Sequence, residues 1–232
     1  MGLSIAFATG LYGISFGALA VAAGLSIAQT AVLSLLMFTG GSQFAFIGVI
    51  AGGGAASAAI GAATLLGVRN AVYGMQMNRM LAPAGWRKWL AAHLTIDESA
   101  ATAVGQSAPD EQQRGFWTAG VGVFVLWNLF TLLGAWLGDA LGDPRRWGLD
   151  GAAVAAFLGL LWPRLRQREP VALAVLCGVV TALAVPLVPP GLPILLAAAV
   201  GAAWGWWVHT PDVDDAPPSQ TPAHAAAEED AS

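Results

Sequence analysis

The sequence predicts an all-α integral membrane protein: a polytopic bundle of about seven transmembrane helices plus a short or re-entrant segment. Of its 232 residues, 56% are hydrophobic and only 10% are charged, and the mean hydropathy is +0.65. A soluble domain carries about a quarter of its residues as Asp, Glu, Lys and Arg, so these charges are too few for a water-exposed surface. The apolar stretches are long and continuous rather than alternating, which favours helices over the strands of a transmembrane barrel.

Seven apolar stretches are interpreted as spans, because a helix needs about 20 apolar residues to cross the hydrocarbon core of a bilayer. In chain order they are residues 3–27, 28–51, 55–77, 116–137, 151–162, 171–187 and 192–208. Tryptophans near their ends are typical of the membrane–water interface. These tryptophans are Trp86, Trp89, Trp147, Trp162, Trp206 and Trp207.

The two ends of the chain differ in composition. Four glycines of the first stretch are interpreted as positions of close helix packing: Gly10, Gly13, Gly17 and Gly24. Residues 209–232 are rich in Pro, Ala and acidic side chains and have little apolar area to bury. We therefore expect a disordered C-terminal tail after a transmembrane domain of residues 1–208.

One membrane-compatible segment, residues 91–105, is too short and too polar to resemble the other spans. A polar linker, residues 109–114, follows it. The basic segments 79–88 and 164–168 are both expected on the cytoplasmic side. Both can lie there if 91–105 is re-entrant, and the N-terminus is then expected outside and the tail inside.

The stretch Phe38-Thr39-Gly40-Gly41-Ser42-Gln43-Phe44 is unusual inside a predicted span. Two adjacent glycines weaken a helix interior, and Ser42 and Gln43 add polar side chains. One interpretation is a broken helix whose free N–H groups bind an anionic group of a substrate. The alternative is close helix packing through small residues.

Arg69 lies deep in the predicted span 55–77 and is followed by Asn70 and Tyr73. An arginine at this depth costs several kcal/mol unless it is paired or reaches the interface. It could hold a substrate carboxylate through two parallel hydrogen bonds. The alternatives are a structural pair with a nearby acid, or an early end of the span.

Asp97 and Glu98 are adjacent acids within the segment 91–105. They could bind a substrate ammonium or carry a coupling proton, because burial and a neighbouring like charge both favour the protonated carboxyl. The alternative is an exposed interfacial helix in which Thr95 and Glu98 form a capping box.

Other function classes lack their usual residues. The chain has no GxxxxGK[ST] phosphate loop, no HExxH motif and no GxSxG turn, and its three histidines are dispersed. The single Cys177 excludes a disulfide framework or a cysteine-based metal site. No basic run suggests nucleic acid. We therefore expect neither an enzyme nor a metal or cofactor site.

Several of these segments, in this order, resemble the AzlC family of branched-chain amino acid exporters. The resemblance begins at Gly13 and Phe16–Ala20, and the Phe38–Ala45 stretch resembles a FAG(A/S)SQF motif. Val68–Gly74 resembles LRHxLYG, and His93–Glu98 resembles the H-x-x-(T)-D-E segment that follows it. Later features continue the match, which covers residues 3–207: Trp127-Asn128-Leu129, Gly134 and Gly148-Leu149-Asp150. Asn70 departs from the family pattern, which has His at this position.

The resemblance implies a multi-pass permease of the cell inner membrane that exports leucine, isoleucine and valine. It also implies a small hydrophobic AzlD-type membrane subunit as partner. A zwitterionic substrate needs an anion-binding group, a cation-binding group and an apolar pocket. We expect Gly40, Gly41, Ser42, Gln43 and Arg69 to supply the first, and Asp97 or Glu98 the second.

Phe38 and Phe44 are expected in the apolar part of this pocket, with Asn70 and Tyr73 close to the substrate. Three alternatives remain at this point: a transporter or channel for another small amino acid or solute, a membrane enzyme, and a membrane scaffold. A scaffold has little reason to place Arg69, Gln43, Asp97 and Glu98 at costly positions in the membrane.

Overall fold

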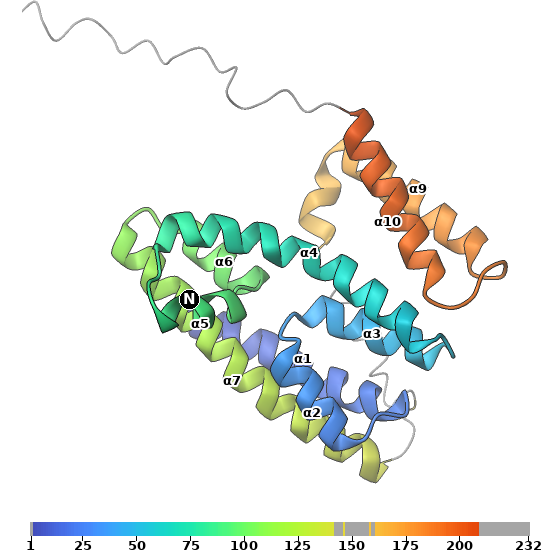
Figure 1. The fold of residues 1–232 in the computed structure, drawn as a ribbon, viewed down its shortest axis with the longest axis horizontal. Coiled ribbons are helices and arrows are strands. Elements are labelled where there is room, and N and C mark those ends of the chain that lie inside the picture. The colour runs from blue at the N-terminus through green and yellow to red at the C-terminus, as the bar shows by residue number, and fades with distance from the viewer. Residues whose placement is uncertain (1, 142–145, 147–157, 159–160, 209–232) are drawn as a thin grey trace, which may run out of the picture.

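The structure, a computed structural model, describes residues 2–141, 146, 158 and 161–208, and these residues form helices and no strands (Figure 1). The predicted span 151–162 falls largely outside this part of the chain, and the predicted tail 209–232 entirely. The helices are α1 (Gly2–Ala22), α2 (Ile27–Leu36), α3 (Gly40–Ala51), α4 (Ala56–Leu81), α5 (Trp86–His93), α6 (Asp97–Val104), α7 (Pro109–Leu141), η2 (Trp162–Arg166), α9 (Arg168–Ala184) and α10 (Leu192–Trp207).

Two described helices, Gly2–Ala22 and Pro109–Ala140, are long and apolar enough to cross a membrane by length and composition. Among the other predicted spans, residues 28–51 are divided between two helices, and the remaining spans stay predictions. The expected linker 109–114 is wrong, because α7 already begins at Pro109. Proline is favourable in the first turn of a helix, and Asp110 and Glu111 complement the positive end of the helix dipole there.

Helices α1 and α7 pack side by side and run parallel. A methyl group on Gly2 would lie 3.2 Å from the Thr118 side chain, and one on Gly13 would lie 2.7 Å from the Trp127 carbonyl oxygen. Gly17 has no room for any side chain against Thr131. The packing interpretation is thus confirmed for the glycines of α1 itself. It is wrong for Gly24, where an added methyl group would meet no described atom within 4 Å, and which adopts a positive φ of 98° in the turn that follows α1.

Helices α2 and α3 form a hairpin instead of the single span predicted for residues 28–51. The side chain of Gln43 donates to the carbonyl oxygens of Leu33 (3.3 Å) and Ser34 (3.4 Å). Residues ten apart in one straight helix are about 15 Å apart, so the chain must turn back between α2 and α3. The turn is residues 37–39, directly before the two adjacent glycines, which weaken helix continuation there.

Helices α5 and α6 form a second hairpin. The guanidinium of Arg87 lies over the Trp117 ring (5.4 Å to its centroid), so α5 begins beside the third turn of α7. Farther in, a methyl on Gly120 would lie 3.2 Å from the Leu94 carbonyl oxygen. Helix α6 then runs back along α7, because a methyl on Gly115 would lie 3.1 Å from the Thr102 carbonyl oxygen. The segment 91–105 therefore enters the bundle and returns toward the end from which it came, as a re-entrant segment does.

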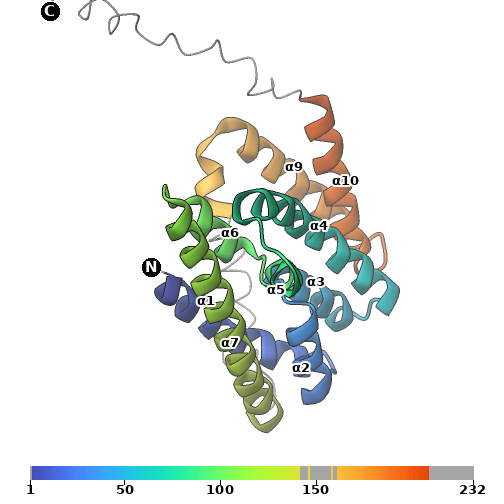
Figure 2. The ribbon, with the colours of Figure 1, turned by 60° about the vertical axis from the view of Figure 1, so that its left-hand side comes forward.

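Each hairpin follows one long helix, and the two hairpins approach from opposite ends of the molecule (Figures 1 and 2). The N-terminus lies at the same end as α5, because Gly2 packs against Thr118, the neighbour of Trp117. The expectation that the N-terminus and residues 79–88 lie on opposite sides is therefore wrong. It assumed that residues 28–51 cross the membrane, whereas they double back.

Candidate functional site

A cavity of about 330 Å³ lies where the three long helices and both hairpins meet. Tyr12 lines it from the middle of α1, Arg69 from the middle of α4, and Trp127 from near the middle of α7. If these helices span a bilayer, the cavity lies near its midplane. This is the depth at which transporters with discontinuous helices bind their substrates.

The tips of the two hairpins complete the cavity wall. Phe38, Thr39, Gly40 and Gly41 come from the first tip, and residues 96–98 come from the second. Both tips present the first turn of a helix: α3 begins at Gly40 and α6 at Asp97. The start of a helix carries partial positive charge and amide groups without partners inside the helix. The interpretation of a broken helix at Gly40 and Gly41 agrees with this geometry.

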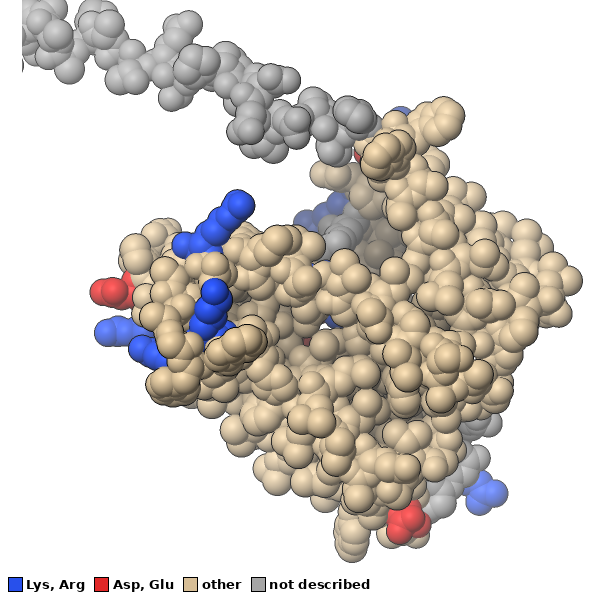
Figure 3. Space-filling model, in the orientation of Figure 1, with Lys and Arg blue, Asp and Glu red and all other residues tan. Residues whose placement is uncertain are grey.

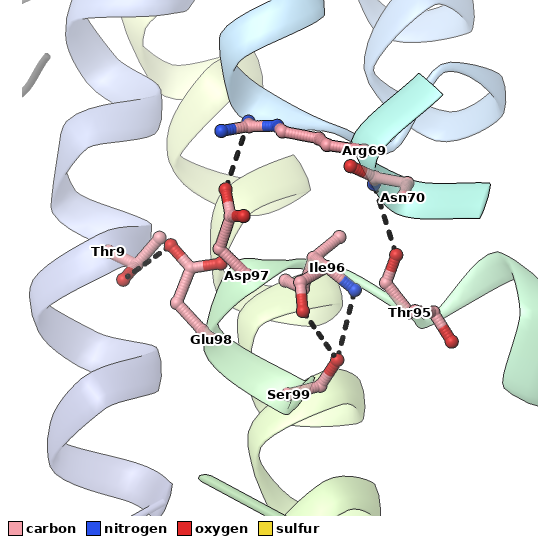
Figure 4. Close-up of polar contacts among 8 residues, drawn as sticks. All are labelled: Thr9, Arg69, Asn70, Thr95, Ile96, Asp97, Glu98 and Ser99. Atoms are coloured by element: carbon pink, nitrogen blue, oxygen red, sulfur yellow. Dashed lines mark hydrogen bonds and ion pairs between the residues drawn. The ribbon is translucent and has the colours of Figure 1, made fainter. Parts of the chain in front are cut away.

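An ion pair joins α4 to α6 across one side of the cavity. Arg69 Nη2 lies 2.9 Å from Asp97 Oδ2, and the two side chains are 34% and 23% exposed (Figure 4). Among the alternatives for Arg69, the structural pair with a nearby acid is therefore present. The pair leaves Arg69 Nε, a buried atom, without a hydrogen-bond partner among the described residues.

Glu98 has a different environment from its neighbour Asp97. Its carboxylate accepts a long hydrogen bond of 3.4 Å from Thr9 Oγ1 on α1 (Figure 4), and no ion pair within the described residues includes it. Helix α6 has eight residues and is too short to span a membrane. Its carboxyl lines the central cavity in the interior of the bundle, beside the second acid, Asp97. Glu98 is thus suited to exchange a proton.

The second tip is held by local hydrogen bonds. Ser99 Oγ accepts from the Ile96 N–H (3.0 Å) and donates to the Leu94 carbonyl oxygen (2.7 Å). Thr95 Oγ1 donates to the Ala91 carbonyl oxygen, so the capping box suggested for Thr95 and Glu98 is wrong. Asn70 Nδ2 donates to the Thr95 carbonyl oxygen (3.1 Å), which ties the tip to α4. This bond fixes the orientation of the Asn70 side chain at the cavity edge.

Several polar atoms of the cavity wall have no hydrogen-bond partner within the part of the chain that the structure describes. They are Tyr12 Oη, Thr39 Oγ1, Arg69 Nε, Asn70 Oδ1 and Trp127 Nε1. Buried polar groups normally have partners, and a cluster of unsatisfied ones needs an explanation such as a ligand. Trp127 is only 3% exposed, and its indole N–H is a donor only. The cavity therefore offers donors and acceptors to a small polar molecule.

Six of the nine predicted site residues line this cavity: Gly40, Gly41, Arg69, Asn70, Asp97 and Glu98. Ser42 lines a separate cavity on the other side of α3, together with Gly67. Gln43 is fully buried and binds the C-terminal carbonyl groups of α2. Tyr73 packs against the hydrophobic core, one turn beyond Arg69.

Sequence reasoning missed Thr9, Tyr12 and Val123 as cavity residues, and noted Trp127 only as part of a family resemblance. Tyr12 is one of only two tyrosines and stands in an uncharged apolar stretch, which was an available signal. Tyr12, Phe44 and Trp127 pack edge to face or nearly so, with ring centroids 5.9–6.3 Å apart. They give the cavity an aromatic wall.

Comparison with known proteins supports a transport role. The family model described as AzlC protein matches residues 4–141, which is more than half of the chain and contains every cavity residue. No curated protein and no solved structure matches the chain. The matched region extends from α1 through both hairpins to the end of α7. The chain thus belongs to the AzlC family, a family of membrane transport proteins.

Proposed function

We propose that this protein exports the branched-chain amino acids leucine, isoleucine and valine across the cell inner membrane. The observation that carries the proposal is a central cavity whose wall includes a cation, two carboxylates, a helix start and aromatic rings. Its volume of about 330 Å³ is at the lower end of the usual range for ligand sites, which suits a small molecule.

The carboxylate of the amino acid is assigned to the start of α3. Two amide groups, those of Gly40 and Gly41, stand there without partners inside the helix, and Thr39 makes no side-chain cap. The Trp127 indole N–H lies in the same wall. Arg69 adds positive charge to this part of the cavity, although Asp97 already occupies one edge of its guanidinium.

The ammonium group is assigned to Glu98, which is the cavity carboxylate without an ion-pair partner among the described residues. Substrate ammonium and a proton would then compete for one carboxyl group, which couples amino acid release to proton uptake. The side chain of the substrate faces Tyr12, Phe44 and Trp127. This wall favours an apolar side chain by removing its surface from water.

The two hairpins suggest how access could alternate. One tip approaches the cavity from each end of the molecule, so displacement of either tip opens the cavity toward its own end. A small hydrophobic AzlD-type subunit is proposed as partner, and this part rests on the family resemblance alone.

The test is efflux of preloaded radiolabelled leucine, isoleucine and valine from cells that express the chain, with and without the small subunit. We expect efflux of all three that depends on the small subunit and is lost in Arg69→Ala and Asp97→Ala, although both variants still insert. Competition by other amino acids tests the alternative, a transporter for another small amino acid or solute. No efflux despite verified insertion of both subunits would refute the proposed substrates.

A further inference from the structure

Four basic side chains lie at the end of the molecule that contains the N-terminus. Arg79 is in the last turn of α4, Arg87 and Lys88 are in the first turn of α5, and Arg114 is in the second turn of α7. All four are exposed, and Figure 3 shows blue side chains gathered at the left-hand end of this face. We call these four residues the basic end.

The basic end is held together by α7. The Arg87 guanidinium stacks over Trp117, one turn after Arg114, so cations from α5 and α7 are neighbours. No ion pair within the described residues uses any of the four. Two exposed acids, Asp110 and Glu111, begin α7 nearby, which leaves four cations against two carboxylates. The local charge is therefore positive.

Two tryptophans flank the cations on α5 and are unusually exposed. Trp86 is 72% exposed and Trp89 is 80% exposed, and Arg87 and Lys88 lie between them. Tryptophan has an apolar ring and a polar N–H, so it is favoured at the depth of lipid headgroups. A helix that exposes tryptophan together with arginine and lysine matches a surface that is apolar below and anionic above.

The lengths of the long helices place the basic end at this same depth. Helix α7 has 33 residues and is about 50 Å long, which exceeds the roughly 30 Å hydrocarbon core of a bilayer. Its polar first turns must therefore extend into the headgroup layer. Helix α4 has 26 residues, about 39 Å, and Arg79 is in its last turn. Helix α7 thus presents Arg114 at the level of the phosphate groups, and the end of α4 lies at the same end of the molecule.

We propose that the basic end binds the phosphate headgroups of anionic phospholipids, with Arg79, Arg87, Lys88 and Arg114 as the contacting cations and Trp86 and Trp89 as interfacial anchors. The occupant is an anionic phospholipid because the surface combines positive charge with exposed apolar rings. Free phosphate would interact with the positive charge alone. This surface lies apart from the central cavity and is independent of the substrate transported.

The test measures lipid binding by the purified full chain in detergent. Native mass spectrometry and thermal unfolding are recorded with dioleoylphosphatidylglycerol, with dioleoylphosphatidylcholine, and with inorganic phosphate. We expect phosphatidylglycerol to bind and to raise the unfolding temperature more than the other two additives. The variant Arg79→Gln/Lys88→Gln removes two cations without removing the Arg87–Trp117 contact. Each cation near an anionic surface increases affinity about fivefold, so the affinity of this double variant for phosphatidylglycerol should fall about 25-fold.

The matched control is Arg166→Gln/Arg168→Gln, which removes two exposed cations from η2 and α9. It should bind phosphatidylglycerol as the unmodified chain does. An equal loss of phosphatidylglycerol affinity in both double variants would overturn the proposal, because binding would then depend on total charge and not on the basic end. Equal stabilisation by phosphatidylcholine, or by inorganic phosphate, would overturn it as well. A folding defect is recognised separately, because each variant is compared with itself with and without lipid.

Discussion

Arg69 and Asp97 form a 2.9 Å ion pair between α4 and α6 at the edge of the central cavity, and the adjacent Glu98 has no ion-pair partner within the described part of the chain. Two neighbouring carboxylates thus have different surroundings. Asp97 is paired with a guanidinium, whereas Glu98 accepts a long hydrogen bond from the Thr9 hydroxyl and has no ion-pair partner among the described residues. The difference suggests separate roles, and the following predictions test them.

The variant Arg69→Ala should lose transport and part of its stability, and Asp97→Ala should do the same. Each leaves one charge unpaired, which costs 3–5 kcal/mol at a fully buried site. Because these side chains are partly exposed, we expect about 1–3 kcal/mol. The exchange Arg69→Asp/Asp97→Arg should recover thermal stability but not efflux, since it reverses the charges that face the substrate. Full efflux in this exchange variant would show that the pair only supports the fold.

The variant Glu98→Gln should uncouple transport from protons. A substrate ammonium binds the ionised carboxylate of Glu98 and not the neutral acid, and the ionised form increases as pH rises. Binding of a substrate ammonium should therefore strengthen with rising pH in the unmodified chain. In Glu98→Gln this pH dependence should disappear, which binding measurements across pH 5–8 on purified protein will detect. The control Glu111→Gln changes an exposed acid of α7 and should keep the pH dependence.

The variant Trp127→Phe should weaken binding of amino acids by roughly tenfold, because it removes a donor to a charged carboxylate. It keeps an aromatic ring stacked near Phe16, so the loss of stability should be only about 1 kcal/mol. Leucine and alanine should lose affinity equally, since both have the same carboxylate. A larger loss for leucine would instead indicate that the indole contacts the side chain of the substrate. The variant Phe44→Leu changes the apolar wall, so it should lose more affinity for leucine than for alanine.

The N-terminus and the start of α5 should be accessible from the same side of the membrane. Cysteine placed at Leu3 and at Lys88 should react with an impermeant reagent from one side, and cysteine at Ala55, between α3 and α4, from the other. The natural Cys177 is replaced by alanine for these experiments. Reaction of Leu3→Cys and Lys88→Cys from opposite sides would contradict the re-entrant course of α2 and α3.

Much of the fold could be predicted from the sequence where a single helix decides it. The apolar runs of α1 and α7 are long enough to indicate spans, and the glycines of α1 indicated close packing. The two hairpins were harder to predict. A broken helix and a continuous one have the same apolar composition, and only the Gln43 contacts with α2 show that residues 28–51 double back.

The candidate site divides in the same way. Charged and polar residues in apolar segments are costly, so the sequence alone singled out Arg69, Asp97, Glu98 and the glycine pair at Gly40. It could not assign Ser42 and Gln43 to their positions outside the cavity, because side-chain direction depends on where α3 begins. Nor could it distinguish Asp97 from Glu98. Which of two adjacent carboxylates meets Arg69 depends on how α4, α6 and α1 pack.

The sequence by itself determined that this chain is helical, apolar and a member of the AzlC family, because composition and local motifs carry that information. Only the tertiary structure decided that the two helical hairpins meet at one cavity and that the N-terminus lies beside the basic end. It also placed Tyr12 and Trp127 in the wall of this cavity. These contacts join residues more than a hundred positions apart in the sequence, such as Tyr12 and Trp127, and their energies depend on packing between helices, which no local pattern of residues specifies.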